Sequence, residues 1–463
     1  MNERTVFLNW RRWATSLPLT RSGLLALQVI GLILCIELVL WPQLNSSFEA
    51  SRRYQGVAAS DWSATNVWLR SAECARETGA WLVICENGKL IPISDRALAD
   101  DPGHALLLAG WARAADRTMT VIDVAHLNLT INLVGLLVLA AALLVLKAYI
   151  PAVVLLLFGP YVFLEWFGTS PHWALIGLSA LQPVLPLGLV ARWRRWVSPA
   201  SGLCLILVGI LALAFASLVR EVIAQMTLIV TLCTLVWIAM ATWRSDRRLA
   251  GLLVLALASV LVSQTARLTV SLRDAIYHVE PAELVATHGM SHTLFIGLGT
   301  VENKFGIQYA DSVGKEAAAK AAPHVTYLSQ DYFQVMWSLY FARWLEDPLE
   351  VLRIYFKKLW AILGDRIPDF FPPIWLFLSL VLPIHWLANG DAGNRGSPGC
   401  DKRLAINLVS LSFIGLFVVQ AILSQSNRFY AAPIGAFTIV MLGVAIENLA
   451  RWLWRIVRTR LAL

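Results

Sequence analysis

Several ionisable residues lie inside or directly beside long apolar segments of the chain, where a charge is costly and tends to serve a function. They are Glu37, Glu165, Arg220, Glu221, Arg267, Arg273 and Arg428. Guanidinium groups form paired, charge-assisted hydrogen bonds with phosphate oxygens. Arg428, Arg267 and Arg220 are therefore candidate ligands for a lipid phosphate. The alternative for each is that it reaches into the headgroup layer or pairs with a nearby carboxylate.

Further candidates fall in the two longest polar stretches. Asp61 closes one polar run, and Asp100 and Asp101 stand shortly before His104. A carboxylate there could act as a general base, although a solvated loop residue or a helix cap is the alternative interpretation. His104 is a candidate for binding phosphate or sugar, and otherwise a surface residue of a helix.

A glycine-rich segment from Ser291 to Asp311 adds three more candidates, Lys304, Tyr309 and Asp311, as a substrate-binding loop. Its glycines are expected mainly to shape the loop. The sequence contains no C-x-x-C pair and no histidine cluster, so no metal site is predicted.

The elements that must position these residues are apolar helices. The chain has 463 residues, 58% of them hydrophobic and 15% charged, which excludes a disordered chain, a disulfide-dense scaffold and an ordinary soluble enzyme. A bilayer span needs about 20 mostly apolar residues. We expect an all-α polytopic membrane protein with about ten spans, at residues 22–42, 119–146, 150–168, 172–191, 200–219, 222–243, 248–266, 371–388, 404–425 and 431–450.

Basic residues cluster in alternate short connections, which is typical of cytoplasmic loops. Both termini are then cytoplasmic, and two large outer pieces, about 43–118 and 267–370, face the periplasm of a bacterial inner membrane. The net charge of +8 becomes an orientation signal rather than a nucleic-acid patch. Cys74 and Cys85 share the first outer piece and are the only plausible disulfide pair, either bonded or free.

The positions of the spans divide the chain into three parts: residues 1–275 with the first outer piece, residues 276–370 as a second outer region, and residues 371–463 as the last spans.

Asp101 and Pro102 indicate the cap and first residue of a surface helix over 105–115. Aromatic and aliphatic residues recur at helical spacing over 329–346 and 348–364, with a break at Asp347–Pro348. This pattern suits interfacial amphipathic helices.

This organisation resembles the GT-C superfamily of integral-membrane glycosyltransferases, which use polyprenyl-phosphate-linked sugars as donors. Asp61 stands about twenty residues after the first span, where that family places its catalytic carboxylate. The segment Asp100–Ala115 resembles the helix that precedes the second span. The turn Asn427–Tyr430 resembles the basic-aromatic turn near the last spans, and the segment His292–Asp311 resembles a loop of bacterial membrane proteins of this type.

The resemblance implies an inverting transfer of one sugar to an acceptor hydroxyl at the periplasmic face, without a cofactor. Asp61 would take the acceptor proton, and Arg428 and Arg267 would stabilise the departing phosphate. The acceptor could be a lipid, a glycan or an exported protein such as a pilin. The chain departs from the family in having Trp62 after Asp61 rather than a second acidic residue, and in its low number of spans.

Three alternatives remain open at this point. A lipid-linked sugar flippase would need polar residues deep in several spans, where the sequence places only Glu37. A non-catalytic membrane assembly factor would need no site at all. A ligase that uses a pyrophosphate-linked oligosaccharide would share the same topology.

Overall fold

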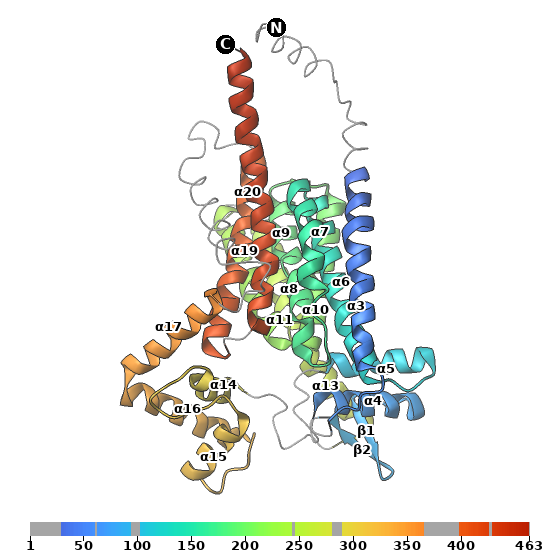
Figure 1. The fold of residues 1–463 in the computed structure, drawn as a ribbon, viewed down its shortest axis with the longest axis vertical. Coiled ribbons are helices and arrows are strands. Elements are labelled where there is room, and N and C mark those ends of the chain that lie inside the picture. Colours follow the sequence, from blue (N-terminus) through green and yellow to red (C-terminus); the bar gives the residue numbers. More distant parts are fainter. Residues whose placement is uncertain are drawn as a thin grey trace.

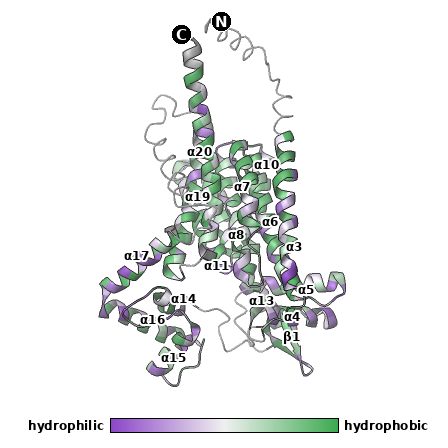
Figure 2. Ribbon diagram, in the orientation of Figure 1, coloured by the Kyte–Doolittle hydropathy of each residue, from purple (hydrophilic) through white to green (hydrophobic). Residues whose placement is uncertain are grey.

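The computed structural model describes residues 29–60, 63–93, 102–242, 246–279, 289–364, 398–425 and 428–462. A tall bundle of helices carries two smaller pieces at one end, called here the outer end, and the end of α20 projects from the opposite end (Figure 1). Apolar residues dominate the bundle, while polar residues gather on the two outer pieces (Figure 2).

Helices of the bundle match most of the expected spans. Seven are long and apolar enough to cross a membrane: 29–54, 121–145, 171–193, 199–219, 221–242, 402–423 and 429–454. An eighth candidate, 249–262 with 265–277, is bent by 52°. The structure therefore supports an all-α polytopic membrane protein, with seven or eight spans by length and composition among the described residues instead of ten. The expected span 371–388 lies outside the described residues.

The elements of the bundle can be followed in chain order in Figure 1. They are η1 (Ile36–Leu40), α3 (Trp41–Ser51), η2 (Arg52–Tyr54), α6 (Val121–Val145), α7 (Tyr149–Phe163), η4 (Pro171–Ala174), α8 (Leu175–Leu181), α9 (Val184–Trp193), α10 (Pro199–Val219), α11 (Glu221–Thr242), α12 (Asp246–Val262), α13 (Thr265–Tyr277), α19 (Pro398–Leu423) and α20 (Arg428–Ala462).

Two boundaries differ from expectation. The first helix continues well past residue 42, since Pro42 stands at the start of α3, where its missing N–H is tolerated. Helix α7 is only 15 residues long and ends at Phe163, so it is too short to match the expected span 150–168.

A close helix contact sits at the centre of the bundle. A Cβ on Gly135 of α6 would meet the backbone of Gly177 of α8 at 2.2 Å, and one on Gly177 would meet the backbone of Asn132 at 2.4 Å. Small residues at such a crossing let two backbones approach closely. The side chain of Asn132 uses this proximity, since its Oδ1 accepts the amide of Gly177 at 2.9 Å.

The first outer piece consists of α4 (Ala64–Thr78), β1 (Val83–Glu86), β2 (Lys89–Pro92) and α5 (Gly103–Ala115). The two antiparallel strands were not expected. Their turn is Asn87–Gly88, both at positive φ, which is the two-residue turn that best matches strand twist. Helix α5 begins at Gly103 with Pro102 as its N-cap, one residue later than expected, so the expectation that Asp101 is the cap and Pro102 the first helical residue is wrong.

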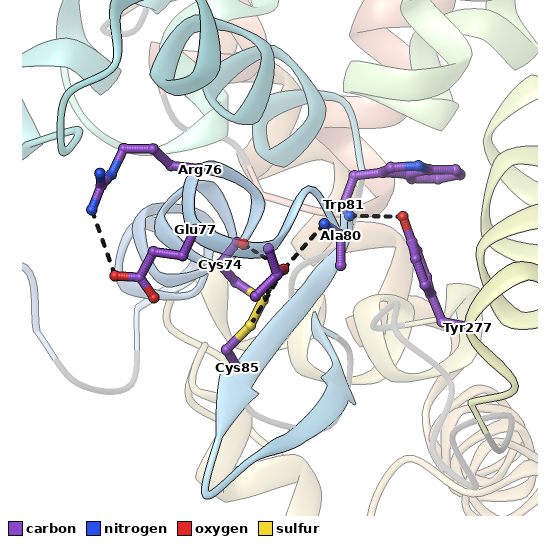
Figure 3. The surroundings of a disulfide bond; sticks show 8 residues. Cys74, Arg76, Glu77, Ala80, Trp81, Cys85 and Tyr277 are labelled. Atoms are coloured by element: carbon purple, nitrogen blue, oxygen red, sulfur yellow. Dashed lines mark hydrogen bonds and ion pairs between the residues drawn. A yellow bond between two sulfur atoms is a disulfide. The ribbon is translucent and has the colours of Figure 1, made fainter.

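A disulfide joins Cys74 of α4 to Cys85 of β1 (Figure 3). The expected pair is therefore formed. Beside it, the Tyr277 hydroxyl at the end of α13 accepts the Trp81 amide at 3.2 Å. Arg273 of α13 is 2% exposed and donates to the carbonyl of Leu82 at 3.0 Å. These contacts fix the first outer piece to the bent α12–α13 pair.

The second outer piece consists of α14 (Met290–Gly297), η5 (Leu298–Thr300), α15 (Asp311–Ala321), α16 (Gln330–Glu346) and α17 (Pro348–Gly364). The last two agree with the expected amphipathic helices. The expected glycine-rich loop is partly wrong, because about its first half forms α14 and η5. Helix α14 is too short and too apolar to show a helical period in the sequence.

The glycine crossing generates a stability prediction. Gly177→Ala should lower the free energy of unfolding by about 1–3 kcal/mol, because the added methyl group has no space between α6 and α8. Gly415→Ala on exposed α19 is the matched control, since a Cβ there meets nothing within 4 Å. Thermal unfolding in detergent compares the two variants. An equal effect of both would contradict the close-packing account.

The disulfide generates a second prediction. Replacing Cys74 and Cys85 by serine should lower the free energy of unfolding by about 2–4 kcal/mol, because the unfolded chain gains freedom. In the denatured wild type, maleimide should label these two cysteines only after reduction. Labelling without reductant would show that the bond is not formed.

Candidate functional site

Residues from four distant parts of the chain converge at the outer end of the bundle. They are His104 of α5, Arg220 between α10 and α11, Tyr309 of the segment before α15, and Tyr430 of the first turn of α20. Arg220 lies near enough to His104 and to Tyr309 for its charge to lower the pKa of both. Tyr309 also lies within electrostatic reach of Tyr430 and Asp311. We call these four residues the outer cluster.

Arg220 is held at a break between two spans. It is the C-cap of α10 in an extended conformation, and its amide donates to the carbonyl of Ala216 at 2.7 Å. The next residue, Glu221, begins α11 and accepts from Arg267 at 3.2 Å. A charged pair at the turn between two apolar helices keeps the break at the water-facing end of the bundle.

His104 is positioned by close packing. A Cβ on the preceding Gly103 would meet the backbone of Leu218 at 2.8 Å, so α5 starts directly against the end of α10. The imidazole is fully buried and stacks on Trp68 with ring centroids 4.3 Å apart. Its Nε2 lies 2.8 Å from Oδ1 of Asn128.

The protonation state of His104 follows from these contacts. Asn128 donates its amide group to the carbonyls of Gly168 and Ser170, so its Oδ1 faces His104 and accepts from Nε2. Burial lowers the pKa of His104 to about 4, with the charge of Arg220 acting in the same direction. The ring is therefore neutral at pH 7, and it presents Nδ1 as an acceptor. Among the described residues, this buried nitrogen has no hydrogen-bond partner.

Tyr309 and Asp311 are carried by the segment before α15. Asp311 lies 3.2 Å from Nε2 of His292, and Nδ1 of His292 lies 2.6 Å from the hydroxyl of Tyr332. His292 is fully buried, so it fixes the start of α15 on the rest of the second outer piece. Burial raises the pKa of Tyr309 above its ordinary value, and Tyr430 and Asp311 add to the rise. Tyr309 is thus a protonated hydrogen-bond donor.

An aromatic cradle receives the first turn of α20. The ring of Phe429 packs edge-on against Trp166 and Trp173 at centroid distances of 5.7 and 4.9 Å. The hydroxyl of Tyr430 lies 3.3 Å from Nε2 of His172. These contacts hold the described aromatic part of the expected turn, and Tyr430 lies within electrostatic reach of Tyr309. Arg428 itself begins α20, and its side chain is outside the described residues.

The remaining candidates have different places. Asp61, Asp100 and Asp101 lie outside the described residues. Arg267 is 70% exposed and pairs with Glu221. Lys304 is paired with Asp347 at 3.4 Å, and its amide donates to Glu350, so it holds the segment onto the start of α17 and does not join the outer cluster. Glu37 is exposed within η1.

Sequence reasoning missed three residues that build the site. Asn128 and Asn132, four residues apart within an apolar span, donate hydrogen bonds to backbone carbonyls of the connection between α7 and α8. His172 forms a hydrogen bond with the hydroxyl of Tyr430. Amides inside a span are the signal that could have found the first two. His172 follows a Ser–Pro pair and gives no comparable signal.

A groove of about 700 Å³ opens on the outside of the bundle between α3 and the start of α6. Phe48, Arg52 and His126 line it, together with residues 55–58. The Nε2 of His126 lies 2.8 Å from the hydroxyl of Ser51, which fixes the ring at the groove wall.

No group of three or more histidine, cysteine, aspartate or glutamate residues suitable for a metal ion occurs in the described part of the chain. The chemistry available at the outer cluster is therefore that of a guanidinium, two phenols and a neutral imidazole. Such a set can bind an anion and hydrogen-bond hydroxyl groups.

His104 generates a prediction on pH dependence. Its pKa is lowered from 6.5 to about 4 on folding, so the unfolded chain takes up a proton over this range that the folded chain does not. The free energy of unfolding should fall as the pH drops from 6.5 to 4, by about 3 kcal/mol in total. His104→Gln, which keeps a donor for Asn128, should flatten this part of the profile. Thermal unfolding in detergent across pH measures it, and identical profiles would contradict the buried neutral ring.

Comparison with known proteins adds nothing to this geometry. The chain matches no family model, no curated protein and no solved structure. The function of the outer cluster must therefore be inferred from its own chemistry and position.

Proposed function

We propose that the protein is a GT-C-type inverting glycosyltransferase that moves one sugar from a polyprenyl-phosphate donor to an acceptor hydroxyl. The observation that carries the proposal is the convergence of Arg220, Tyr309 and Tyr430 with His104 at the end of the bundle where both outer pieces attach. A membrane-embedded donor presents its phosphate and sugar at that level. The guanidinium suits the phosphate, and the phenols suit sugar hydroxyls.

In the proposed reaction, the acceptor oxygen forms a bond to the anomeric carbon while the bond from that carbon to the phosphate oxygen breaks. Asp61 takes the acceptor proton, with Asp100 or Asp101 as the alternative base. The phosphate leaves as an anion and needs no proton from an acid. Arg428 and Arg220 stabilise its charge, and a single displacement inverts the anomeric centre.

The proposed setting is a bacterial inner membrane with both termini cytoplasmic and the outer cluster at the periplasmic face. This assignment rests on the alternation of basic connections. The partners are membrane lipids, the lipid-linked donor and a glycan, lipid or protein acceptor, with no cofactor. In the described spans, buried Gln182 and Thr227 hydrogen-bond each other and helix carbonyls.

The proposal generates a mutational prediction. Asp61→Asn should abolish sugar transfer in cells while leaving the protein folded, because an amide cannot accept the acceptor proton. The matched control is Asp116→Asn in the same outer piece, where the aspartate side chain is 90% exposed. Surface glycans and glycoproteins are compared by mass spectrometry in a deletion strain complemented with each variant.

Three outcomes separate the alternatives. Retained transfer by Asp61→Asn with loss in Asp100→Asn or Asp101→Asn would move the base to that residue. Arg220→Gln should reduce transfer by about 10²–10³-fold if it contacts the leaving phosphate. A deletion strain with unchanged glycans would overturn the glycosyltransferase proposal itself.

A further inference from the structure

Helix α17 has two opposed apolar faces. Its inner face is packed inside the protein, and Val351, Ile354 and Ile362 are each fully buried. Its outer face is open, with Leu349, Phe356 and Trp360 exposed by 75, 70 and 79%. Leu345, at the end of the preceding helix α16, is also exposed, by 87%. We call Leu345, Leu349, Leu352, Phe356 and Trp360 the apolar stripe.

The spacing explains why the four stripe residues of α17 form one surface. Positions 349, 352, 356 and 360 recur at intervals of three and four, so they line one side of α17, while Leu345 precedes the break at Asp347. The buried residues stand about half a turn away. A contiguous open face of large apolar side chains is unusual for a surface in contact with water and marks an interaction site.

The inner face of α17 holds the segment that carries Tyr309. Glu350 is almost fully buried, and it accepts the amide of Lys304 at 2.9 Å and the guanidinium of Arg353. Lys358 is fully buried and donates to the carbonyls of Gly297 and Ser424, each at 2.9 Å. One lysine thus ties the end of α14 and the end of α19 to α17.

We propose that the apolar stripe is seated in the lipid of the membrane that the bundle crosses, and that α17 thereby sets the height of the Tyr309 segment over the outer cluster. The proposal does not depend on the sugar-transfer chemistry. It concerns which surface contacts lipid and what that contact positions.

Lipid is favoured as the occupant because the stripe continues from the membrane bundle. Helix α17 packs against α19, and Ile362 belongs to the core of the bundle, so the helix leaves the bundle directly at its outer end (Figure 1). Exposed Lys357 lies beside the stripe and suits anionic headgroups. A protein partner would be the other occupant.

The test uses nitroxide labels on the full chain in liposomes of phosphatidylethanolamine and phosphatidylglycerol. Single cysteines are placed at Leu349 and Phe356, in a background without Cys35, Cys204, Cys233 and Cys400 but with the Cys74–Cys85 bond kept. Ala319 on exposed α15 supplies the control position. Collision rates with oxygen, which concentrates in lipid, are compared with those of a water-soluble nickel chelate.

Labels at positions 349 and 356 should show an oxygen-to-nickel collision ratio several-fold higher than the label at 319. A ratio equal to that at 319 would place the stripe in water and overturn the proposal. Low collision rates with both reagents would place it against protein, either a partner or a second copy, and would overturn it equally.

A second measurement tests the positioning of the segment. Phe356→Ser with Trp360→Ser should speed tryptic cleavage after Lys304 in the same liposomes. The reason is that weaker contact of α17 with lipid loosens the segment that α17 holds. The matched control is Leu253→Ser with Leu261→Ser, two residues of α12 exposed by 63 and 66%. Equal cleavage rates in the two variants would show that the contact of α17 with lipid does not determine the position of the Tyr309 segment. Neither pair belongs to the outer cluster, so sugar transfer is not needed as a readout.

Discussion

The architecture of the outer end depends on how one irregular connection inside an apolar bundle satisfies its backbone. The chain between α7 and α8 has no helix partner for its carbonyls, and such groups are costly in a dry environment. Asn132 donates to Trp166 and Trp173, Asn128 to Gly168 and Ser170. Thr65 of α4 donates to Thr169. Three side chains thus replace the missing helical hydrogen bonds.

The same connection links the membrane bundle to the outer cluster. Trp166, Trp173 and His172 form the cradle that receives Phe429 and Tyr430, so the start of α20 depends on the bonds of Asn132. The Oδ1 of Asn128 accepts from Nε2 of His104 and so fixes the orientation of the ring, while burial keeps the ring neutral. A single span, α6, therefore helps to position both α5 and the start of α20 at the outer end.

The sequence predicts the regular elements well, because their signals are local. Apolar runs locate most spans, and the aromatic period over 329–346 and 348–364 locates α16 and α17. It could not locate α14, which shows no period, or the pairing of His292 with Asp311 and Tyr332, which joins residues distant along the chain. The hairpin at Asn87–Gly88 could have been predicted from the sequence, since that dipeptide is a strong turn signal.

The arginines at the outer end show why the candidate site needed the structure. Sequence position alone makes Arg220, Arg267 and Arg273 equivalent, because each adjoins a span. Arg273 is buried, where it forms an ion pair with Asp274 and donates to the carbonyl of Leu82. Its role is therefore structural. Arg267 forms an ion pair with Glu221 and is largely exposed to solvent. Arg220 alone of these three acts electrostatically on both His104 and Tyr309, which places it in the outer cluster.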